Sequence, residues 1–489
     1  MARAATDSFI LELKLKTSEE DARFLEKCMY FGWKVHNTLV RHCQKQLASL
    51  RQDPEYRELL TAYRKETDRA DKQRINRELS AIVAGYGLTE YSLHAFVAKL
   101  QHKFRKWVHS AVAQKIATHV WQGVRKVLYA KGKELHFLKY VDFTTLEGKQ
   151  NTTGIVFADN RIRYAGCVID VRRHRKDGSS ARKYECEALR HRVKYCRIIR
   201  RVVGQRFHYY VQLVLEGMPP IKHYTGSGTA GLDIGTSTAA VVTDQECILT
   251  VLGENVAAIE REKRHIQRKM DRSRRAANPG NYTPDGTVRK GRKVWVKSIT
   301  YRKLQRCFAS LCRKRAAALK QSHQILANHI IAQCDTLYVE KMSFKGLQRC
   351  SGKQKDGRSG RKKRFGKSIQ NRAPAQFCSI LRQKLERLGG QYLEVNTRTF
   401  RASQYNHVTD ACCRKPLSRR GNTIEGRWVQ RDLYSAFLLK NSADNLRHTD
   451  RAKCIGTYPA FLLAHDACIQ AIRHSETTIP KSFGFQAFT

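Results

Sequence analysis

The segment Gly231–Asp244 constrains the fold more than any other part of the chain, because it places one carboxylate inside a buried-strand pattern. Its sequence is Gly-Leu-Asp-Ile-Gly-Thr-Ser-Thr-Ala-Ala-Val-Val-Thr-Asp, with apolar residues on both sides of a tight Gly-Thr-Ser turn. This pattern predicts a hairpin of two core strands. An acid on a core strand is costly unless it is paired or binds a cation. We therefore expect Asp233 to have partners elsewhere in the chain.

The composition narrows the kinds of partner. Lysine and arginine number 92 against 43 acidic residues, so the 489-residue chain has a formal charge of +49. A protein this basic repels itself unless a polyanion neutralises it, and nucleic acid is the commonest such polyanion. A membrane-surface protein or a ribosomal-type binder without chemistry is the alternative. The charge is spread over predicted helices, strands and loops, which favours nucleic-acid binding.

Membrane and secretion signals are missing from the sequence. No run approaches the roughly 20 apolar residues that span a bilayer, and the N-terminal residues do not lead into a signal peptide. The 15 cysteines have no framework spacing, which indicates free thiols in a reducing cytosol. We expect a cytoplasmic protein of two or three domains.

The first half of the chain is predicted to contain a strand, a helical block and a β block. Alternation over Phe9–Lys16 predicts the strand, and Thr17–Glu20 has the form of a capping box that opens a helix. Helical patterning continues to about residue 130. Short alternating runs from 137 to 215 then predict a small β domain, which we expect to be a barrel with the N-terminal strand completing its sheet.

Two basic segments are candidates for nucleic-acid contact. In Gln101–Trp107, expected within the last helix of the helical block, bases and aromatics interleave, as in a stacking surface or equally in an amphipathic helix with a buried aromatic face. Residues 345–373 are basic, glycine-rich and nearly free of apolar residues, so we expect a solvated loop until an anion orders it. The candidate residues are Lys103, Arg105, Lys106, Trp107, Lys345, Arg361, Lys362, Lys363 and Arg364.

An alternating αβ pattern follows the clearest linker in the chain, Met218–Gly228. After the opening hairpin it predicts a strand over 248–252, helices over about 255–275 and 300–333, a strand over 335–341, a helix over 374–388 and a strand over 392–396. This is the element order of the RNase H-like fold, in which the first and fourth strands are neighbours.

Three carboxylates are expected to converge in this domain. Asp233 lies on the first strand, Glu340 ends the fourth, and Asp432 begins what we expect to be the last clear helix, Asp432–Lys440. Three acids at one point cannot all stay ionised without cations. The usual solution is two Mg²⁺ ions about 4 Å apart that activate water and stabilise the leaving oxygen of a phosphodiester.

Each acid alone has a simpler interpretation. Asp233 could belong to the Asp-x-Gly-Thr motif of a sugar-kinase or actin-type ATPase, but those enzymes need further glycine-rich motifs. The one Gly-Gly pair, Gly389-Gly390, is typical of a helix end. Glu340 could pair with Lys341, and Asp432 could be an acid favoured by the helix dipole. The joint placement favours a metal site.

The chain resembles the TnpB proteins of insertion-sequence transposons and their relatives, the compact type V CRISPR effector nucleases. The resemblance rests on three segments that match the RuvC nuclease motifs in order and approximate spacing: Gly231-Leu-Asp-Ile-Gly235, Leu337-Tyr-Val-Glu-Lys-Met-Ser-Phe-Lys-Gly-Leu347 and Val429-Gln-Arg-Asp-Leu-Tyr-Ser-Ala-Phe-Leu438. It implies a wedge β-barrel (1–17 and 133–222) interrupted by a helical recognition domain (18–132). A RuvC nuclease domain (223–489) follows, with a zinc-finger-like insert over 398–430.

The same resemblance implies an RNA-guided DNA endonuclease of a prokaryotic cytoplasm. A guide RNA would pair with one strand of double-stranded target DNA while the protein recognises a short flanking DNA motif. Asp233, Glu340 and Asp432 would be the catalytic acids and would bind Mg²⁺. We expect a monomer. Two other functions stay open: an RNA-guided DNA-binding protein that does not cut, and an unguided RuvC-type resolvase or transposase.

The chain departs from the family pattern in two places. Many members carry two Cys-x-x-Cys pairs between the second and third motifs, a zinc signature. Here Cys412 and Cys413 are adjacent and His407 is the one histidine nearby, so we expect no zinc.

The second departure lies in the third motif, which often reads Asp-x-Asn-Ala-Ala in the family. This chain has Tyr434 in place of the asparagine. If the register were shifted, Asp410 or Asp444 would be the third acid instead of Asp432.

Overall fold

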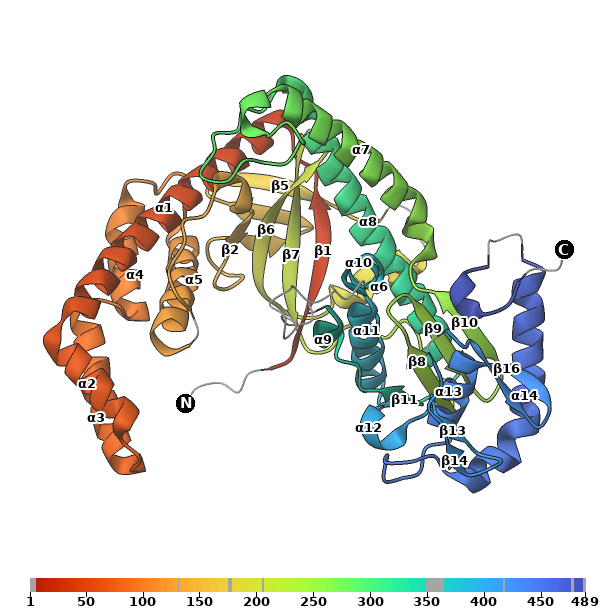
Figure 1. The fold of residues 1–489 in the computed structure, drawn as a ribbon. Coiled ribbons are helices and arrows are strands. Elements are labelled where there is room, and N and C mark those ends of the chain that lie inside the picture. The colour runs from red at the N-terminus through yellow and green to blue at the C-terminus, as the bar shows by residue number, and fades with distance from the viewer. Residues whose placement is uncertain are drawn as a thin grey trace. The chain divides into compact units, whose positions relative to one another are not determined.

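The computed structural model describes residues 6–130, 132–174, 178–204, 206–348, 365–416, 418–475 and 479–486. The chain divides into two compact units, residues 1–220 and 221–489, and the expected linker Met218–Gly228 lies across their boundary. Each unit contains a sheet with its own buried core (Figure 1). In the described part of the chain, no helix is long and apolar enough to cross a membrane.

The first unit begins with strand β1 and a run of helices. Their bounds are β1 Ser8–Leu15, α1 Glu19–Gln52, α2 Pro54–Lys65, α3 Arg69–Gly85, α4 Glu90–His102 and α5 Ser110–Tyr129. The expected capping box is wrong by one residue. Ser18 Oγ accepts a hydrogen bond from Asp21 N at 3.1 Å, and the Asp21 carboxylate accepts one from Ser18 N at 2.9 Å. The strand backbone still pairs at Lys16, whose N donates to Asp170 O at 2.8 Å, so the helix begins later.

The sheet of the first unit has seven antiparallel strands in the order β2-β6-β7-β1-β5-β4-β3. The remaining elements are 3-10 helix η1 Tyr140–Asp142, β2 Thr145–Glu147, β3 Val156–Ala158, β4 Arg161–Tyr164, β5 Cys167–Arg172, α6 Ser180–Ala188, β6 Val193–Val203 and β7 Arg206–Glu216. The N-terminal strand β1 lies between β7 and β5, which confirms that it completes this sheet. The expected barrel is confirmed in part: the sheet curls into a half-barrel, and among the described residues its short edge strands β2 and β3 do not pair to close it.

The second unit is built on a five-stranded sheet in the order β10-β9-β8-β11-β12. The strands are β8 Thr229–Ile234, β9 Thr238–Val242, β10 Cys247–Val251, β11 Thr336–Glu340 and β12 Gln391–Val395. The first three are antiparallel, whereas β11 runs parallel to both β8 and β12. The predicted contact between the first and fourth strands is therefore confirmed.

Helices cover both faces of this sheet (Figure 1). Leu232 and Val339 pack with α8 and α11 on one face, while Ala240 and Val242 pack with α13 and α14 on the other. The bounds are η2 Glu254–Val256, α7 Ala257–Ala276, η3 Pro279–Asn281, α8 Ile299–Ile331, α9 Phe344–Gln348, α10 Phe365–Arg372, α11 Pro374–Arg387, α12 Thr397–Phe400, α13 Arg431–Lys440, α14 Arg451–Arg473 and η4 Lys481–Phe483. Two small hairpins precede α13, namely β13 Tyr405–Asn406 with β14 Ala411–Cys412, and β15 Gly421–Ile424 with β16 Arg427–Gln430.

Two sequence predictions for this unit are wrong. The helix that contains Asp432 is not the last one, since α14 follows it; Gly456 and Pro459 inside α14 weaken the helical signal in the sequence. The expected loop over 345–373 begins and ends in helices, because α9 and α10 occupy its described ends. Residues 349–364 of that loop lie outside the described residues.

Candidate active site

Asp233 and Glu340 lie on neighbouring parallel strands and face the same side of the sheet. Gly231 pairs with Tyr338 and Leu232 with Val339, so the register continued by one residue places Asp233 opposite Glu340. Leu232 and Val339 point toward α8 and α11. Because successive side chains alternate along a strand, the two acids face the side covered by α13.

Asp432 lies in the first turn of α13, where a negative charge is favoured by the helix dipole. The Gln430 side chain caps this helix by accepting a hydrogen bond from Leu433 N at 2.7 Å. The helix packs very closely on β8 at Gly231, where an added Cβ would lie only 2.0 Å from Ala436 O. Only glycine permits this approach, which brings Asp432 to the strand that carries Asp233.

The far end of α13 is joined to the sheet by an ion pair. Lys440 Nζ, on the last residue of the helix, lies 2.6 Å from Asp244 Oδ1. The other carboxylate oxygen of Asp244 accepts a hydrogen bond from Thr229 N at 3.0 Å, at the start of β8. Asp244 therefore fixes α13 and β8 to each other at the end remote from the acids.

Asp233 lies within the electrostatic field of both other acids. Burial raises the pKa of Asp233 well above its usual range, and the charges of Asp432 and Glu340 raise it further, against a smaller opposing effect of Arg431. Burial also raises the pKa of Glu340 to about 7. The pKa of Asp432 is raised by burial, although the guanidinium groups of Arg420 and Arg431 oppose this.

The donor chemistry of this cluster fits Mg²⁺. Carboxylate oxygens are the hard ligands that Mg²⁺ prefers, and the raised pKa values mean that full ionisation requires a compensating positive charge. The positions of the described side chains, however, do not form a complete metal site. Across the described ranges, no three His, Cys, Asp or Glu side chains are close enough together to hold a metal ion as they stand.

The alternative third acids lie in other surroundings. Asp410 accepts a hydrogen bond from the Tyr405 hydroxyl at 2.9 Å, and Asp444 is exposed beside Lys453. Neither acid contributes to the raised pKa of Asp233, whereas Asp432 does. The structure therefore brings Asp432 to Asp233 and leaves the other two apart.

Tyr434, which departs from the family motif, has a structural role. It is buried in the core beside α14, and its hydroxyl oxygen lies 2.8 Å from His407 Nδ1 and 3.2 Å from His407 N. His407 is thereby buried and hydrogen-bonded, while Cys412 and Cys413 are exposed. The absence of zinc stays a prediction.

The predicted nucleic-acid contacts around Trp107 are in a turn and not inside a helix, contrary to expectation. The turn between α4 and α5 is closed by Gln101 Nε2, which donates to Val108 O at 2.8 Å. The Trp107 ring centroid lies 5.4 Å from that of Phe24 and 5.9 Å from that of Phe31, so this half-buried ring packs against the core. The exposed candidates among the described residues are Lys103, Arg105, Lys106 and Lys345, whereas Arg361, Lys362, Lys363 and Arg364 lie outside them.

Sequence reasoning missed the two arginines beside Asp432. Arg431 is buried, and its guanidinium donates to Pro416 O at 3.1 Å while its backbone N donates to Arg420 O at 2.9 Å. The sequence could have indicated Arg431, because it is the neighbour of Asp432 in the chain. It could not have indicated Arg420, because the hairpin β15–β16 brings that residue to Asp432.

Comparison with known proteins gives little further evidence. The chain matches no protein-family model and no curated protein. Among solved structures it is similar to a cryo-EM Cas12f1–sgRNA–target DNA complex, with 11% identity, 90% of this chain and 99% of that chain covered, and a TM-score of 0.47. It is also similar to a cryo-EM CRISPR–Cas12f ternary complex, with 13% identity, 87% and 86% covered, and a TM-score of 0.26.

Proposed function

We propose that this protein is an RNA-guided DNA endonuclease with a single RuvC-type site formed by Asp233, Glu340 and Asp432. The observation that supports the proposal is that two adjacent strands and the first turn of one helix carry three acids, where burial and then the charges of Asp432 and Glu340 raise the pKa of Asp233. The strand order β10-β9-β8-β11-β12 supports an RNase H-like domain.

The acids would act by hydrolysing a phosphodiester bond. Two bound Mg²⁺ ions would polarise the attacking water and stabilise the leaving oxygen. The strand backbones position Asp233 and Glu340, and the capped first turn of α13 positions Asp432, so these three carboxylates would supply the protein ligands to the ions. Arg420 and Arg431 favour the ionised form of Asp432, the form that binds a cation.

The proposed partners are a guide RNA and double-stranded target DNA. The charge of +49 supports binding to nucleic acid, and the resemblance of the chain to TnpB proteins and compact type V effectors supports the guided mechanism. Recognition of a short flanking DNA motif by the protein belongs to the same proposal.

The decisive test is cleavage of a matched target by the Asp233→Asn variant in the presence of guide RNA and Mg²⁺. We expect cleavage to be abolished and guide binding to be unchanged, because the substitution removes one carboxylate without changing shape or charge elsewhere. Asp444→Asn serves as the matched control and should cut at the wild-type rate. Undiminished cleavage by Asp233→Asn would overturn the assignment of the site.

One observation favours a second function, RNA-guided DNA binding without cleavage. Among the described residues, the acids do not form a complete set of metal ligands. A chain that cannot bind the metal ions would bind its target DNA but leave it uncut. Incubating the wild-type protein with guide, target and Mg²⁺ distinguishes the two, since stable binding with uncut DNA would support the non-cutting function.

A further inference from the structure

The solvent face of helix α1 carries a basic stripe with one aromatic ring in it. The stripe consists of Lys27, Tyr30, Lys34, Arg41 and Lys45, and all five residues are exposed. Positions three, four or seven residues apart lie on the same side of an α-helix, so these side chains share one face. The buried residues of α1 lie on the opposite face. The stripe therefore stays open to a partner.

The cations of the stripe are not neutralised by the protein. Across the described part of the chain, none of the four forms an ion pair with a carboxylate. The neighbouring acids are used elsewhere. Glu26 turns toward the sheet and pairs with Arg200 at 2.7 Å, whereas Glu19 pairs with Arg23 at 3.2 Å, one turn before the stripe begins. The stripe thus presents positive charge that a polyanion can neutralise.

Tyr30 places an aromatic surface among these cations. The residue is 38% exposed, and Lys34 Nζ lies 4.8 Å from the centroid of its ring. The ring and this cation are therefore in direct contact. Lys27 and Lys34 start about 10 Å apart along the helix, with Tyr30 between them. Because the lysine stem is flexible, Lys34 can swing from the ring to a phosphate when a base takes its place.

Two further rings support Tyr30. The centroids of Trp33 and Tyr140 lie 5.8 and 5.7 Å from that of Tyr30, and 5.7 Å from each other. The indole of Trp33 is fixed, since its Nε1 donates to Leu138 O at 2.7 Å. Tyr30, Trp33 and Tyr140 therefore form one aromatic cluster, of which Tyr30 is the member that belongs to the basic stripe.

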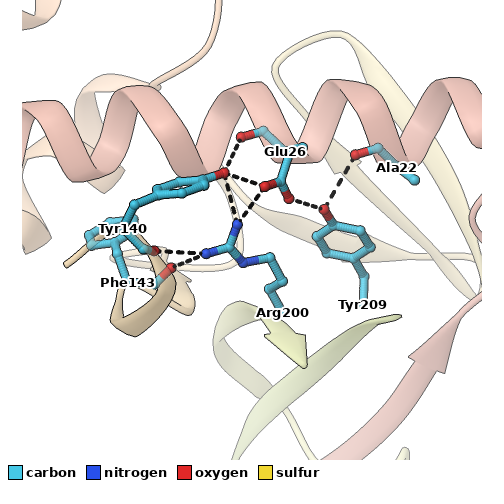
Figure 2. Close-up of polar contacts among 6 residues, drawn as sticks. All are labelled: Ala22, Glu26, Tyr140, Phe143, Arg200 and Tyr209. Atoms are coloured by element: carbon cyan, nitrogen blue, oxygen red, sulfur yellow. Dashed lines mark hydrogen bonds and ion pairs between the residues drawn. The ribbon is translucent and has the colours of Figure 1, made fainter. Parts of the chain in front are cut away.

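Tyr140 is fixed by a network of hydrogen bonds (Figure 2). Arg200, only 2% exposed, donates from Nη1 to the Tyr140 hydroxyl at 2.8 Å and to Glu26 Oε1 at 2.7 Å. Its Nη2 donates to the backbone oxygens of Tyr140 and Phe143 at 2.9 and 3.0 Å. The Tyr209 hydroxyl donates to the other Glu26 oxygen at 3.0 Å. The network joins α1, η1, β6 and β7, so the aromatic cluster is formed before a ligand arrives.

The turn between α4 and α5 adds one more cation beside the stripe. Lys27 Nζ and Lys106 Nζ lie 5.1 and 5.3 Å from the centroid of the same ring, that of Trp107. Lys106, a residue that the sequence indicated for nucleic-acid contact, therefore lies next to the basic stripe and extends its charge.

We propose that the basic stripe binds a single-stranded segment of the guide RNA, with one unpaired base stacked on Tyr30 and the adjacent phosphates contacted by Lys27 and Lys34. Proteins commonly bind unpaired RNA bases by aromatic stacking, and lysine is a usual phosphate contact. The target DNA is double-stranded, so its bases are already stacked on one another, whereas RNA offers an open base. The inference rests on the proposed function for the presence of a guide RNA.

The test uses the full chain and a single-stranded RNA of mixed sequence in which 2-aminopurine replaces adenine, with a DNA of the same sequence as the second arm. Stacking quenches the fluorescence of 2-aminopurine, so the wild type should quench the RNA. Tyr30→Leu removes the π surface, and we expect about tenfold weaker RNA binding and loss of the quench. Tyr30→Trp should keep both.

The matched control is Tyr63→Leu. Tyr63 is 36% exposed on α2, and Lys72 Nζ lies 6.0 Å from its ring centroid, but it lies outside the basic stripe. This variant should bind and quench as the wild type does. Lys34→Gln should lower the slope of log affinity against log salt by about 0.7, because one phosphate contact is lost. Lys72→Gln should leave the slope unchanged.

The outcomes separate this inference from the proposed function. Wild-type affinity and quenching in Tyr30→Leu, in a chain that binds the RNA, would overturn the stacking site alone. If Tyr30→Leu does not fold, Lys34→Gln decides, since an unchanged salt slope would overturn the site. Quenching of the DNA without the RNA would overturn RNA as the occupant.

Two results concern the proposed function itself. A wild-type chain that binds neither oligonucleotide would overturn both the basic stripe as a binding site and the proposed function. A chain that quenches the RNA through Tyr30 but leaves a matched target uncut would overturn cleavage and support the stripe. Asp233→Asn should keep the quench, because Asp233 belongs to the other unit.

Discussion

At the scale of single residues, the buried carboxyl of Glu340 should make the stability of the cation-free protein depend on pH. The pKa of Glu340 is about 7 in the folded chain, above its ordinary value of 4.5. Between these values the folded chain holds a proton that the unfolded chain has released, so the free energy of unfolding falls as the pH rises through this window. Cation binding would offset the loss.

Glu340→Gln should therefore stabilise the cation-free protein at alkaline pH. At about pH 8 we expect the free energy of unfolding of the variant to exceed that of the wild type by about 2 kcal/mol after allowance for solvent screening, because the amide carries no charge to bury. At about pH 4 the difference should vanish, since the wild-type carboxyl is then protonated. Urea denaturation at both pH values measures the effect. An equal difference at the two pH values would contradict it.

Gly231→Ala tests the close contact between β8 and α13. The new Cβ would lie 2.0 Å from Ala436 O, so the helix must move away from the strand. We expect the free energy of unfolding to fall by about 1–3 kcal/mol and cleavage to be lost as Asp432 is displaced. Gly280→Ala is the control, because nothing lies within 4 Å of its added Cβ. Wild-type stability and cleavage in Gly231→Ala would contradict the prediction, because they would show that β8 and α13 do not need this close contact.

The adjacency of Asp233 and Glu340 could be predicted from the sequence, but the contact that places Asp432 could not. Strand alternation and the order of the elements are local signals, and they locate the first two acids. The role of Gly231 depends on Ala436, which is distant in sequence and meets it only after folding. The same limit applies to Tyr434, whose partner His407 is supplied by the folded insert.

At the scale of elements, the residue at which a helix begins is the least predictable feature. Thr17 and Ser18 are each followed three residues later by an acid, so the sequence allows two capping boxes. The choice between them follows from the sheet, which extends to Lys16 and leaves Ser18 as the cap. Similarly, α14 was missed because Gly456 and Pro459 interrupt its pattern.

Ser18→Ala and Thr17→Ala form a matched pair that tests this register. Ser18→Ala should lower the free energy of unfolding by about 1 kcal/mol, because the amide of Asp21 loses its acceptor. Thr17→Ala should change it by less than about 0.5 kcal/mol. Denaturant titrations of the two variants give the comparison. A larger loss in Thr17→Ala would place the cap at the other residue.

At the scale of the whole molecule, charge dominates. The 92 lysines and arginines outnumber the 43 acids, so the excess of cations cannot be paired within the chain. The sign and size of this charge follow from composition alone, whereas its location depends on the fold. Lys14 and Arg172 are far apart in the chain, and the sheet places them opposite each other.

Binding to nucleic acid should therefore depend steeply on salt. We expect the affinity of the full chain for RNA to fall at least a hundredfold between about 0.05 and 0.2 M monovalent salt, because several counterions are released on binding. Fluorescence anisotropy with a labelled RNA measures the slope. Asp233→Asn should give the same slope as the wild type, and an affinity that ignores salt would contradict a role for the charge.

Because Asp244 anchors one end of α13, the site should tolerate substitutions within this helix better than insertions or deletions. Lys440 is fixed to Asp244 at one end of the helix, and Asp432 must reach Asp233 at the other. Each residue added or removed between them would turn Asp432 by about 100° around the helix axis while the anchor holds. Substitutions that keep the packing leave the acid in place, whereas a single insertion or deletion moves it off the site.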